Sequence, residues 1–218
     1  MTFHIPYTPK QWKVITGCKR HCSYCFAADH WEHPDNRPHF HPERLNFPAM
    51  ITPPDWARRA GLNMMHVCPT SEWLSEWIPW EWTNAIVEVI QHNPQWIYFC
   101  VSKSPERFPE ISWPEYCRLA ITIDVQSRVE PAEAAFREVK SRYKIAHVEP
   151  MLERLSFNDL SIFDAIFIGP AHPTSKYPGK QPNPEWVSFL IGQAREAGIK
   201  VYCSPLLVVP FVKPMEAF

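Results

Sequence analysis

Glycine is scarce in this sequence, and long apolar runs are missing. The 218 residues include 6 glycines but 24 prolines. Few turns can therefore depend on the positive backbone φ that glycine tolerates, and the loops are expected to be stiff. No apolar run approaches the roughly 18 residues that a membrane helix needs, and residues 1–10 lack the charged and apolar regions of a signal peptide. We expect a cytoplasmic protein that does not contact a membrane.

An excess of charge of either sign is also absent. The chain carries 22 Lys and Arg against 23 Asp and Glu, a formal net charge of −1. This balance argues against a large non-specific surface for nucleic acid or membrane, although it leaves room for a local basic cleft. Apolar residues make up 45% of the chain, which is enough for the core of a single domain over residues 1–218.

The seven cysteines are an odd number in a chain that is too long to need disulfides. In a reducing cytosol such cysteines serve as metal ligands, as nucleophiles or as small core residues. The ten tryptophans indicate wide aromatic surfaces in the core or in a cleft.

Short apolar runs alternate with amphipathic stretches along the chain. Seven runs rich in Val, Ile, Tyr or Met predict buried parallel strands, at residues 12–16, 62–68, 96–101, 119–124, 144–148, 165–169 and 200–204. Helices are predicted at residues 80–91, 131–139 and 184–196, with Gly61 and Gly198 as helix C-caps. This order predicts an α/β fold with right-handed crossovers, either an open sheet or a partial barrel. The site is then expected at the C-terminal ends of the strands.

Residues 29–55 have a different composition. They contain many prolines and four histidines, and we expect one long ordered loop here rather than a second metal site; the histidines are His30, His33, His39 and His41.

The strongest chemical pattern is a run of three cysteines in residues 16–28, directly after the first predicted strand. Cys18, Cys22 and Cys25 stand four and three residues apart. Three thiolates on one tight loop can hold three corners of a cubane [4Fe–4S] cluster. No other cysteine is close in sequence, so the fourth iron would be open to a small molecule. The alternative is a zinc site that uses these cysteines with His21 or a histidine of residues 29–55.

This pattern resembles the radical S-adenosylmethionine (SAM) superfamily, whose signature is Cys-x3-Cys-x2-Cys with an aromatic residue, here Tyr24, before the last cysteine. The resemblance implies that the three cysteines bind the cluster and that its open iron binds SAM. An electron from a donor such as flavodoxin or ferredoxin then cleaves SAM to methionine and a 5′-deoxyadenosyl radical, which abstracts hydrogen from the substrate. The backbone near Tyr24 and Phe26 is implied to face the adenine.

The whole chain is similar to a small phage- and prophage-associated three-cysteine family of unknown activity, and more distantly to spore photoproduct lyase. This resemblance implies a partial (β/α)6 TIM-type barrel, and the phage association suggests a nucleotide or nucleic acid as substrate. The matching stretches are Phe40-His41-Pro42-Glu43-Arg44-Leu45, Val67-Cys68-Pro69-Thr70-Ser71-Glu72-Trp73, Ser102-Lys103-Ser104-Pro105-Glu106-Arg107, Ile121-Thr122-Ile123-Asp124, His147-Val148-Glu149-Pro150 and Ile168-Gly169-Pro170.

Two of these stretches depart from the superfamily pattern. After the second strand, radical SAM enzymes carry a Gly-Gly-Glu-Pro-type segment that holds the amino group of SAM. Here residues 68–72 contain no glycine, and Ser71 and Glu72 are implied as the oxygen acceptors. The sixth strand of relatives often ends in Gly-Gly-Glu-Ser, whereas this chain keeps Gly169, a candidate cofactor-binding residue, but has no carboxylate there.

Other strand-end side chains are candidates for the same site. Asp124 or Thr122, which share a face by period-two alternation, are expected to bind the ribose of SAM. Glu149 is expected to bind SAM or the substrate, with a structural ion pair to Arg142 as the alternative. Lys103 is expected to neutralise the SAM carboxylate or a substrate phosphate, or else to be a surface lysine.

Cysteines and tryptophans elsewhere each have two interpretations. Cys68 or Cys100 could donate a hydrogen atom to a substrate radical, or could be a small buried residue. Four tryptophans could stack on a nucleobase or pack in the core; they are Trp73, Trp77, Trp80 and Trp82. The sequence thus predicts a minimal radical SAM enzyme with one [4Fe–4S] cluster, against the alternative of a non-catalytic protein that binds zinc or a cluster.

Overall fold

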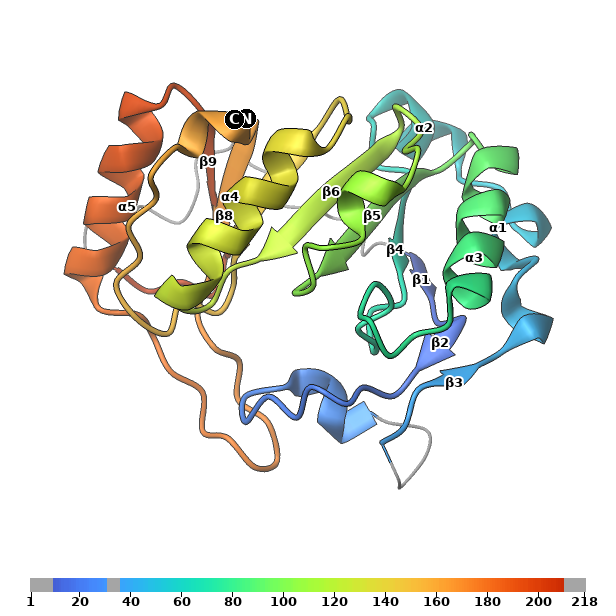
Figure 1. Ribbon diagram of the computed structural model, residues 1–218, viewed down its shortest axis with the longest axis horizontal. Helices are drawn as coiled ribbons and strands as arrows, with labels where there is room; N and C mark the ends of the chain where they lie inside the picture. The colour runs from blue at the N-terminus through green and yellow to red at the C-terminus, as the bar shows by residue number, and fades with distance from the viewer. Residues whose placement is uncertain (1–9, 31–35, 210–218) are drawn as a thin grey trace.

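A computed structural model describes residues 10–30 and 36–209 of the chain (Figure 1). Its centre is a parallel sheet of seven strands in the order β1-β4-β5-β6-β7-β8-β9. The strands are β1 (Lys10–Trp12), β4 (Met64–Val67), β5 (Ile97–Ser102), β6 (Cys117–Thr122), β7 (Lys144–Val148), β8 (Ala165–Ile168) and β9 (Lys200–Cys203). His33 lies outside the described residues. So do residues 1–9, most of the segment that was expected to lack the features of a signal peptide.

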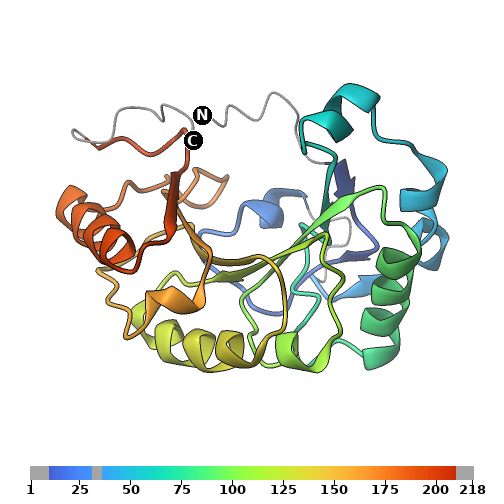
Figure 2. The ribbon, with the colours of Figure 1, turned by 90° about the horizontal axis from the view of Figure 1, so that it is seen from above.

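The sheet is curved, and its helices lie on the outer face. Figure 2 shows α3 (Trp80–His92), α4 (Val129–Glu138) and α5 (Pro184–Glu196) outside the arc of strands, while the segment with η1 (Phe26–His30) lies on the inside. The crossovers after β5 and β7 carry the short 3₁₀ turns η3 (Phe108–Glu110) and η5 (Leu160–Ile162). The predicted fold class, a partial TIM-type barrel with parallel strands, is confirmed.

Burial alternates along the strands because successive side chains point to opposite faces of the sheet. In β4, Met65 and Val67 are fully buried in the core together with Ile86 and Ile90 of α3. His66, which lies between them in sequence, is half-buried on the concave face. Each large apolar side chain buried in this way contributes about 1.5–3 kcal/mol. The outer face therefore supplies the stability, and the concave face is left for chemistry.

The first predicted strand, residues 12–16, is divided in the structure. β1 ends at Trp12 and pairs with β4, whereas β2 (Ile15–Thr16) leaves the sheet and pairs antiparallel with β3 (His39–Phe40). The expectation of one long loop over residues 29–55 is wrong for the same reason. This region contains β3, η2 (Pro42–Arg44), α1 (Phe47–Met50) and the start of α2 (Asp55–Arg59), and elements this short show no periodicity in the sequence.

The helix ends agree with the sequence more closely. Asn183 precedes α5 and its side chain accepts a hydrogen bond from the Glu185 backbone N–H at 2.9 Å. Gly61 and Gly198 have φ of +66° and +71°, as expected for residues that follow a helix in the left-handed region. In the part of the chain that the structure describes, no helix is both long and apolar enough to cross a membrane.

Gly17, the turn between β2 and the cysteines, offers a direct test of this fold. It has φ of +81°, and a Cβ added there would lie 2.0 Å from the backbone oxygen of Arg37. Gly61 has φ of +66° with no atom within 4 Å of such a Cβ. We expect Gly61→Ala to lower the free energy of unfolding by the left-handed cost of about 1–2 kcal/mol. Gly17→Ala should lower the free energy of unfolding clearly more, because the backbone at Arg37 must also move to make room for the Cβ. Urea denaturation measures both, and equal losses would contradict the described turn.

Candidate functional site

The three predicted cysteines lie on a compact loop, residues 16–28, which we call the cysteine loop. Its entry is fixed where the Cys18 backbone N–H donates to the Asn36 carbonyl at 2.9 Å. Tight turns follow, since the Cys25 N–H donates to the Cys22 carbonyl and the Ala28 N–H donates to the Cys25 carbonyl, each at 3.1 Å. All three thiols are free and half-buried, so the turns present them as one group.

The pKa of the Cys18 thiol is affected by the other two cysteines. Burial raises its pKa to about 11, the backbone N–H of Arg20 at 3.4 Å from Sγ lowers it, and Glu72, Cys25 and Cys22 raise it further. The neighbouring cysteines contribute because their sulfurs are close. Binding of a metal centre to thiolates must therefore displace protons from this group.

The thiol of Cys25 has a comparable environment. Burial raises its pKa, the backbone N–H groups of Ala28 and Ala27 lower it, Cys22 raises it and Lys103 lowers it. Two backbone donors and a lysine thus favour the thiolate that a metal requires. Hydrogen bonds of this kind also tune the potential of iron–sulfur clusters.

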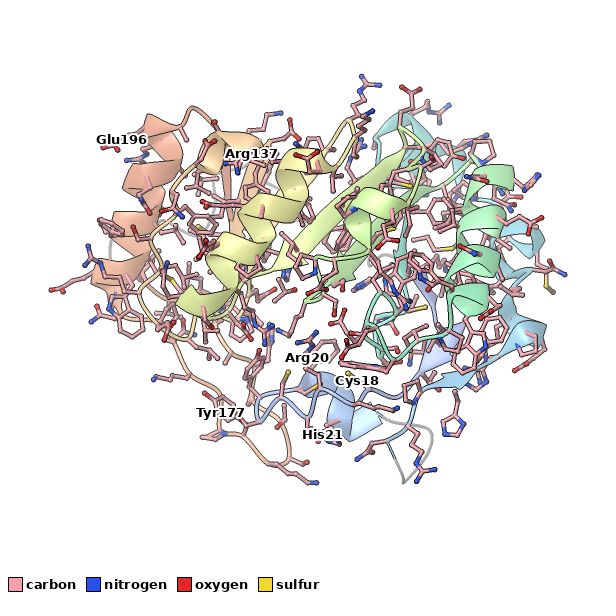
Figure 3. All side chains as sticks on the ribbon, in the orientation of Figure 1. Cys18, Arg20, His21, Arg137, Tyr177 and Glu196 are labelled. Atoms are coloured by element: carbon pink, nitrogen blue, oxygen red, sulfur yellow. The ribbon has the colours of Figure 1, made fainter. Side chains whose placement is uncertain are left out.

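The zinc alternative required a histidine beside the cysteines. His21 is exposed and has a positive φ of 50°, and Figure 3 places it with Cys18 and Arg20 on the loop below the strands. Across residues 10–30 and 36–209, no three His, Cys, Asp or Glu side chains converge in the way that a single metal ion requires. His33, one of the histidines of that alternative, lies outside the described residues, so the zinc site stays an alternative to the cluster.

A buried network joins the cysteine loop to the ends of β5 and β6. The Tyr24 hydroxyl donates to Asp124 Oδ2 and accepts from Lys103 Nζ at 2.9 Å. Lys103 Nζ also lies 3.2 Å from Asp124 Oδ2, and Arg128 Nε lies 2.6 Å from Oδ1. Burial alone would raise the pKa of Asp124, but Lys103, Tyr24 and Arg128 together hold it below its usual value. Both oxygens of Asp124 are thus engaged within the protein.

A second connection is centred on Glu72, whose side chain is 7% exposed. Its carboxylate accepts from the Ser102 hydroxyl and from the Lys103 backbone N–H at 3.1 and 2.9 Å. Arg20 Nε lies 3.6 Å from the same carboxylate, and its terminal nitrogen donates to Ser104 Oγ at 2.6 Å. Glu72 therefore organises the loops, and Arg20 holds the cysteine loop to them. No sequence pattern points to Arg20, because a basic residue between two cysteines matches no known motif.

The segment after β4 presents polar atoms that have no partner. The hydroxyls of Thr70 and Ser71 are buried and make no hydrogen bond in the part of the chain that the structure describes. The Ser71 backbone N–H donates to the Cys68 carbonyl at 3.0 Å, which fixes the turn. A buried hydroxyl without a partner is costly, so this turn is suited to a ligand that supplies the missing hydrogen bond.

Glu149, after β7, lies against Gly169, after β8. A Cβ at Gly169 would be 2.2 Å from Glu149 Oε1, so this carboxylate would have to shift if residue 169 had a side chain. His172 Nε2 lies 3.3 Å from Oε1 and His147 Nε2 lies 3.8 Å from Oε2. The arginine of the alternative interpretation, Arg142, pairs with Glu115 at 3.4 Å instead. Glu149 thus faces two histidines at the strand ends.

Some expected residues do not join this group. Cys68 is 1% exposed and belongs to the hydrophobic core. Burial raises the pKa of its thiol to about 12, against the lowering effect of the Ile15 and Val14 backbones. Cys100 is also fully buried, and the interpretation of both as small core residues fits this placement. The Phe26 side chain is 50% exposed.

Of the four tryptophans, Trp73 belongs to the core, and Trp77 and Trp82 are half-buried against it. Trp73 is fully buried and meets Trp113 edge to face at 6.2 Å. Trp82 stacks on Phe40 at 5.2 Å. The other two carry arginines over their rings, with Arg20 at 5.6 Å from Trp77 and Arg107 at 4.3 Å from Trp80. These contacts support core packing rather than a surface for nucleobases.

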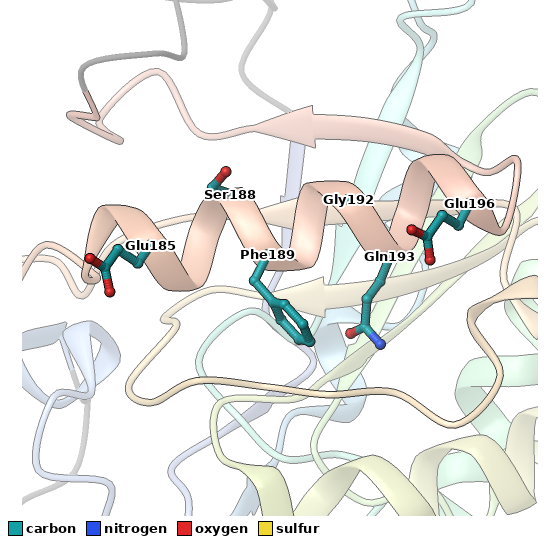
Figure 4. Close-up of a pocket in the computed structure, with 6 residues that line it drawn as sticks. All are labelled: Glu185, Ser188, Phe189, Gly192, Gln193 and Glu196. Carbon is teal, nitrogen blue, oxygen red and sulfur yellow. The ribbon is translucent and has the colours of Figure 1, made fainter.

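Two surface pockets lie elsewhere and contain none of these residues. One adjoins α2 and is lined by Asp55, Arg58 and Arg59. The other runs along α5, as Figure 4 shows, and is lined by Glu185, Ser188, Phe189, Gly192, Gln193 and Glu196. The cysteine loop and the strand ends therefore remain the candidate site.

One solved structure bears directly on the fold. The crystal structure of a radical SAM methyltransferase from Sphaerobacter thermophilus is similar to this chain, with a TM-score of 0.53 and 15% sequence identity. The match covers 90% of this chain and 65% of that chain, so the present chain spans about two thirds of the methyltransferase. The likeness shows a radical SAM-like fold.

Sequence comparison adds the family. No curated protein matches the chain. A family model described as "Protein of unknown function (DUF5131)" matches residues 2–204, and the chain therefore belongs to the DUF5131 family.

Proposed function

We propose that this protein is a radical SAM enzyme with one [4Fe–4S] cluster. The enzyme would use the cluster to cleave SAM reductively, and the resulting radical would abstract hydrogen from the substrate. The observation that carries the proposal is the group of three neighbouring thiols on one loop beside the strand ends of a partial barrel. The radical SAM-like fold supports it. The remaining cysteines are buried in the strands or directly after one; they are Cys68, Cys100, Cys117 and Cys203.

The donor set suits the cluster. Cys18, Cys22 and Cys25 would hold three irons, and backbone N–H groups of the same loop stabilise the thiolates of Cys18 and Cys25. With SAM bound, the cluster supplies the electron that cleaves the sulfonium, and the protein supplies position and electrostatics.

The residues around the thiols suit the polar ends of SAM. The Ser71 hydroxyl has no partner in the described chain and can accept from the SAM ammonium. Lys103 has three N–H donors, of which two serve Tyr24 and Asp124, so the third can bind the SAM carboxylate. Thr122, 5% exposed at the end of β6, is the better ribose ligand because both oxygens of Asp124 are engaged.

The remaining roles follow the same layout. The backbone beside Tyr24 and Phe26 is proposed to face the adenine, and Gly169 and Glu149 to border SAM or the substrate. Glu72 acts as a positioning residue. A flavodoxin or ferredoxin as electron donor, and a nucleotide or nucleic acid as substrate, complete the proposal.

Metal content tests the thiol group. After anaerobic reconstitution, the full chain should contain iron and sulfide in the amounts of one [4Fe–4S] cluster, with broad visible absorbance. Replacement of Cys18, Cys22 and Cys25 by alanine should remove nearly all of the iron, because the protein then has no local thiolates. Cys203→Ala is the matched control and should keep the cluster. Zinc without iron in the wild-type protein would instead favour the zinc-binding alternative.

Binding of SAM tests the turn after β4. Ser71→Ala should weaken SAM binding to the cluster-loaded protein about 10-fold or more, since a hydrogen bond to a charged group is worth about 1.5–3 kcal/mol. Ser127→Ala, which removes an exposed hydroxyl on η4 (Gln126–Arg128), should leave the affinity unchanged. Equilibrium dialysis measures both, and an unchanged affinity in Ser71→Ala would remove this residue from the site.

Catalysis is tested separately with the same protein. Cluster-loaded wild type with SAM and dithionite should form 5′-deoxyadenosine, detected by chromatography, and the triple alanine variant should form none. A fully loaded sample that forms no 5′-deoxyadenosine would contradict the enzymatic proposal and favour a non-catalytic cluster-binding protein.

A further inference from the structure

The concave face of the sheet carries a continuous row of four rings, of which only His147 has been placed in the candidate site. We call it the ring row, and it consists of His66 on β4, Phe99 on β5, His147 on β7 and Phe167 on β8. Ring centroids are 5.3 Å apart for His66 and Phe99, 6.3 Å for Phe99 and His147, and 5.3 Å for His147 and Phe167. The last two rings are nearly parallel, with 7° between their planes.

The ring row does not belong to the packed interior. All four side chains are half-buried, and neither Phe99 nor Phe167 is in the hydrophobic core or packed against it. The helices cover the opposite face of the sheet (Figure 2). Between Phe99 and His147, β6 presents Arg118, Ala120 and Thr122 on this face, with Arg118 in register with Phe99 and Thr122 in register with His147. Partly exposed aromatic rings on the inside of a barrel are surfaces that a ligand can cover.

The two histidines give this surface a defined polarity. Burial lowers the pKa of His66 to about 4 and, together with Lys103 and His66, lowers that of His147 to about 3. Both imidazoles are therefore neutral near pH 7, and each offers one donor and one acceptor.

Much of this hydrogen-bonding capacity is unused. His66 makes no hydrogen bond to any residue that the structure describes, and its ring contacts the Phe99 ring. His147 Nδ1 reaches Thr122 Oγ1 at 3.5 Å, and its Nε2 lies 3.8 Å from Glu149. A flat group with donors and acceptors at its edge would pair with the unused imidazole nitrogens. A purely aliphatic group would leave both imidazoles unpaired.

We propose that the ring row binds a planar heteroaromatic group of the substrate, of the nucleobase class. Its rings supply stacking surfaces and its imidazoles supply edge hydrogen bonds. His147 on β7 lies two residues before Glu149, which follows that strand, and Lys103 is close enough to lower the pKa of His147. A base bound here lies beside the proposed SAM site. The inference rests on the proposed function for its chemistry, but the binding itself does not require the cluster.

The experiment uses the full chain, both as the cluster-loaded and as the cluster-free protein. Adenosine, guanosine, cytidine, uridine and thymidine are the probes, with ribose as the non-aromatic control, and binding is measured by calorimetry. At least one nucleoside should bind and ribose should not. Phe167→Leu should weaken the binding of that nucleoside about 5-fold or more, because stacking of one base is worth about 1–3 kcal/mol. Phe189→Leu on α5 is the matched control and should bind as wild type.

A second variant separates hydrogen bonding from shape. His147→Phe keeps a ring but removes the polar edge, so it should reduce the preference among the five nucleosides. The inference is overturned if no nucleoside binds, or if Phe167→Leu and His147→Phe both bind and discriminate as wild type does. It is also overturned if Phe167→Leu weakens the binding of SAM and leaves the binding of every nucleoside unchanged, because the rings then form part of the SAM site. Nucleoside binding by a protein that forms no cluster would contradict the proposed function alone.

Discussion

The buried carboxylate of Asp124 is the contact on which the arrangement of the site depends. It accepts from Tyr24 in the cysteine loop, from Lys103 after β5 and from Arg128 at the start of α4. A buried charge is costly unless it is paired and hydrogen-bonded, so this carboxylate favours the one geometry in which all three partners reach it. The loop that carries the thiols is thereby held against the strand ends rather than left as a surface turn.

The Arg20–Glu72 contact adds a second connection and has an electrostatic consequence. Arg20 and Lys103 bring two positive charges to the loop, and Lys103 lowers the pKa of Cys25. Three thiolates gathered on one loop repel one another, and nearby cations and N–H groups offset that repulsion. The same contacts that fix the loop therefore also favour the ionised state in which it would bind iron.

The sequence predicts those features that depend on local pattern. The bounds of α5 follow from Pro184 and Gly198, and the cysteine spacing identifies the loop. Features that depend on contacts between distant segments are not visible in it. The division of residues 12–16 arises from pairing with β3 and β4, and Arg20 matters only because Glu72 is folded beside it. The ring row likewise requires the register of four strands, although period-two alternation places each ring on the inner face.

The end of β8 shows how neighbouring strands share one place in the site. Gly169 follows β8 without a side chain, and a Cβ there would require the Glu149 carboxylate, which follows β7, to shift. A carboxylate therefore stands over the end of β8, although β7 supplies it. Beside it, His172 contacts Glu149 Oε1 at 3.3 Å. The charge at this strand end therefore comes from the neighbouring strand, and the contact is visible only in the folded chain.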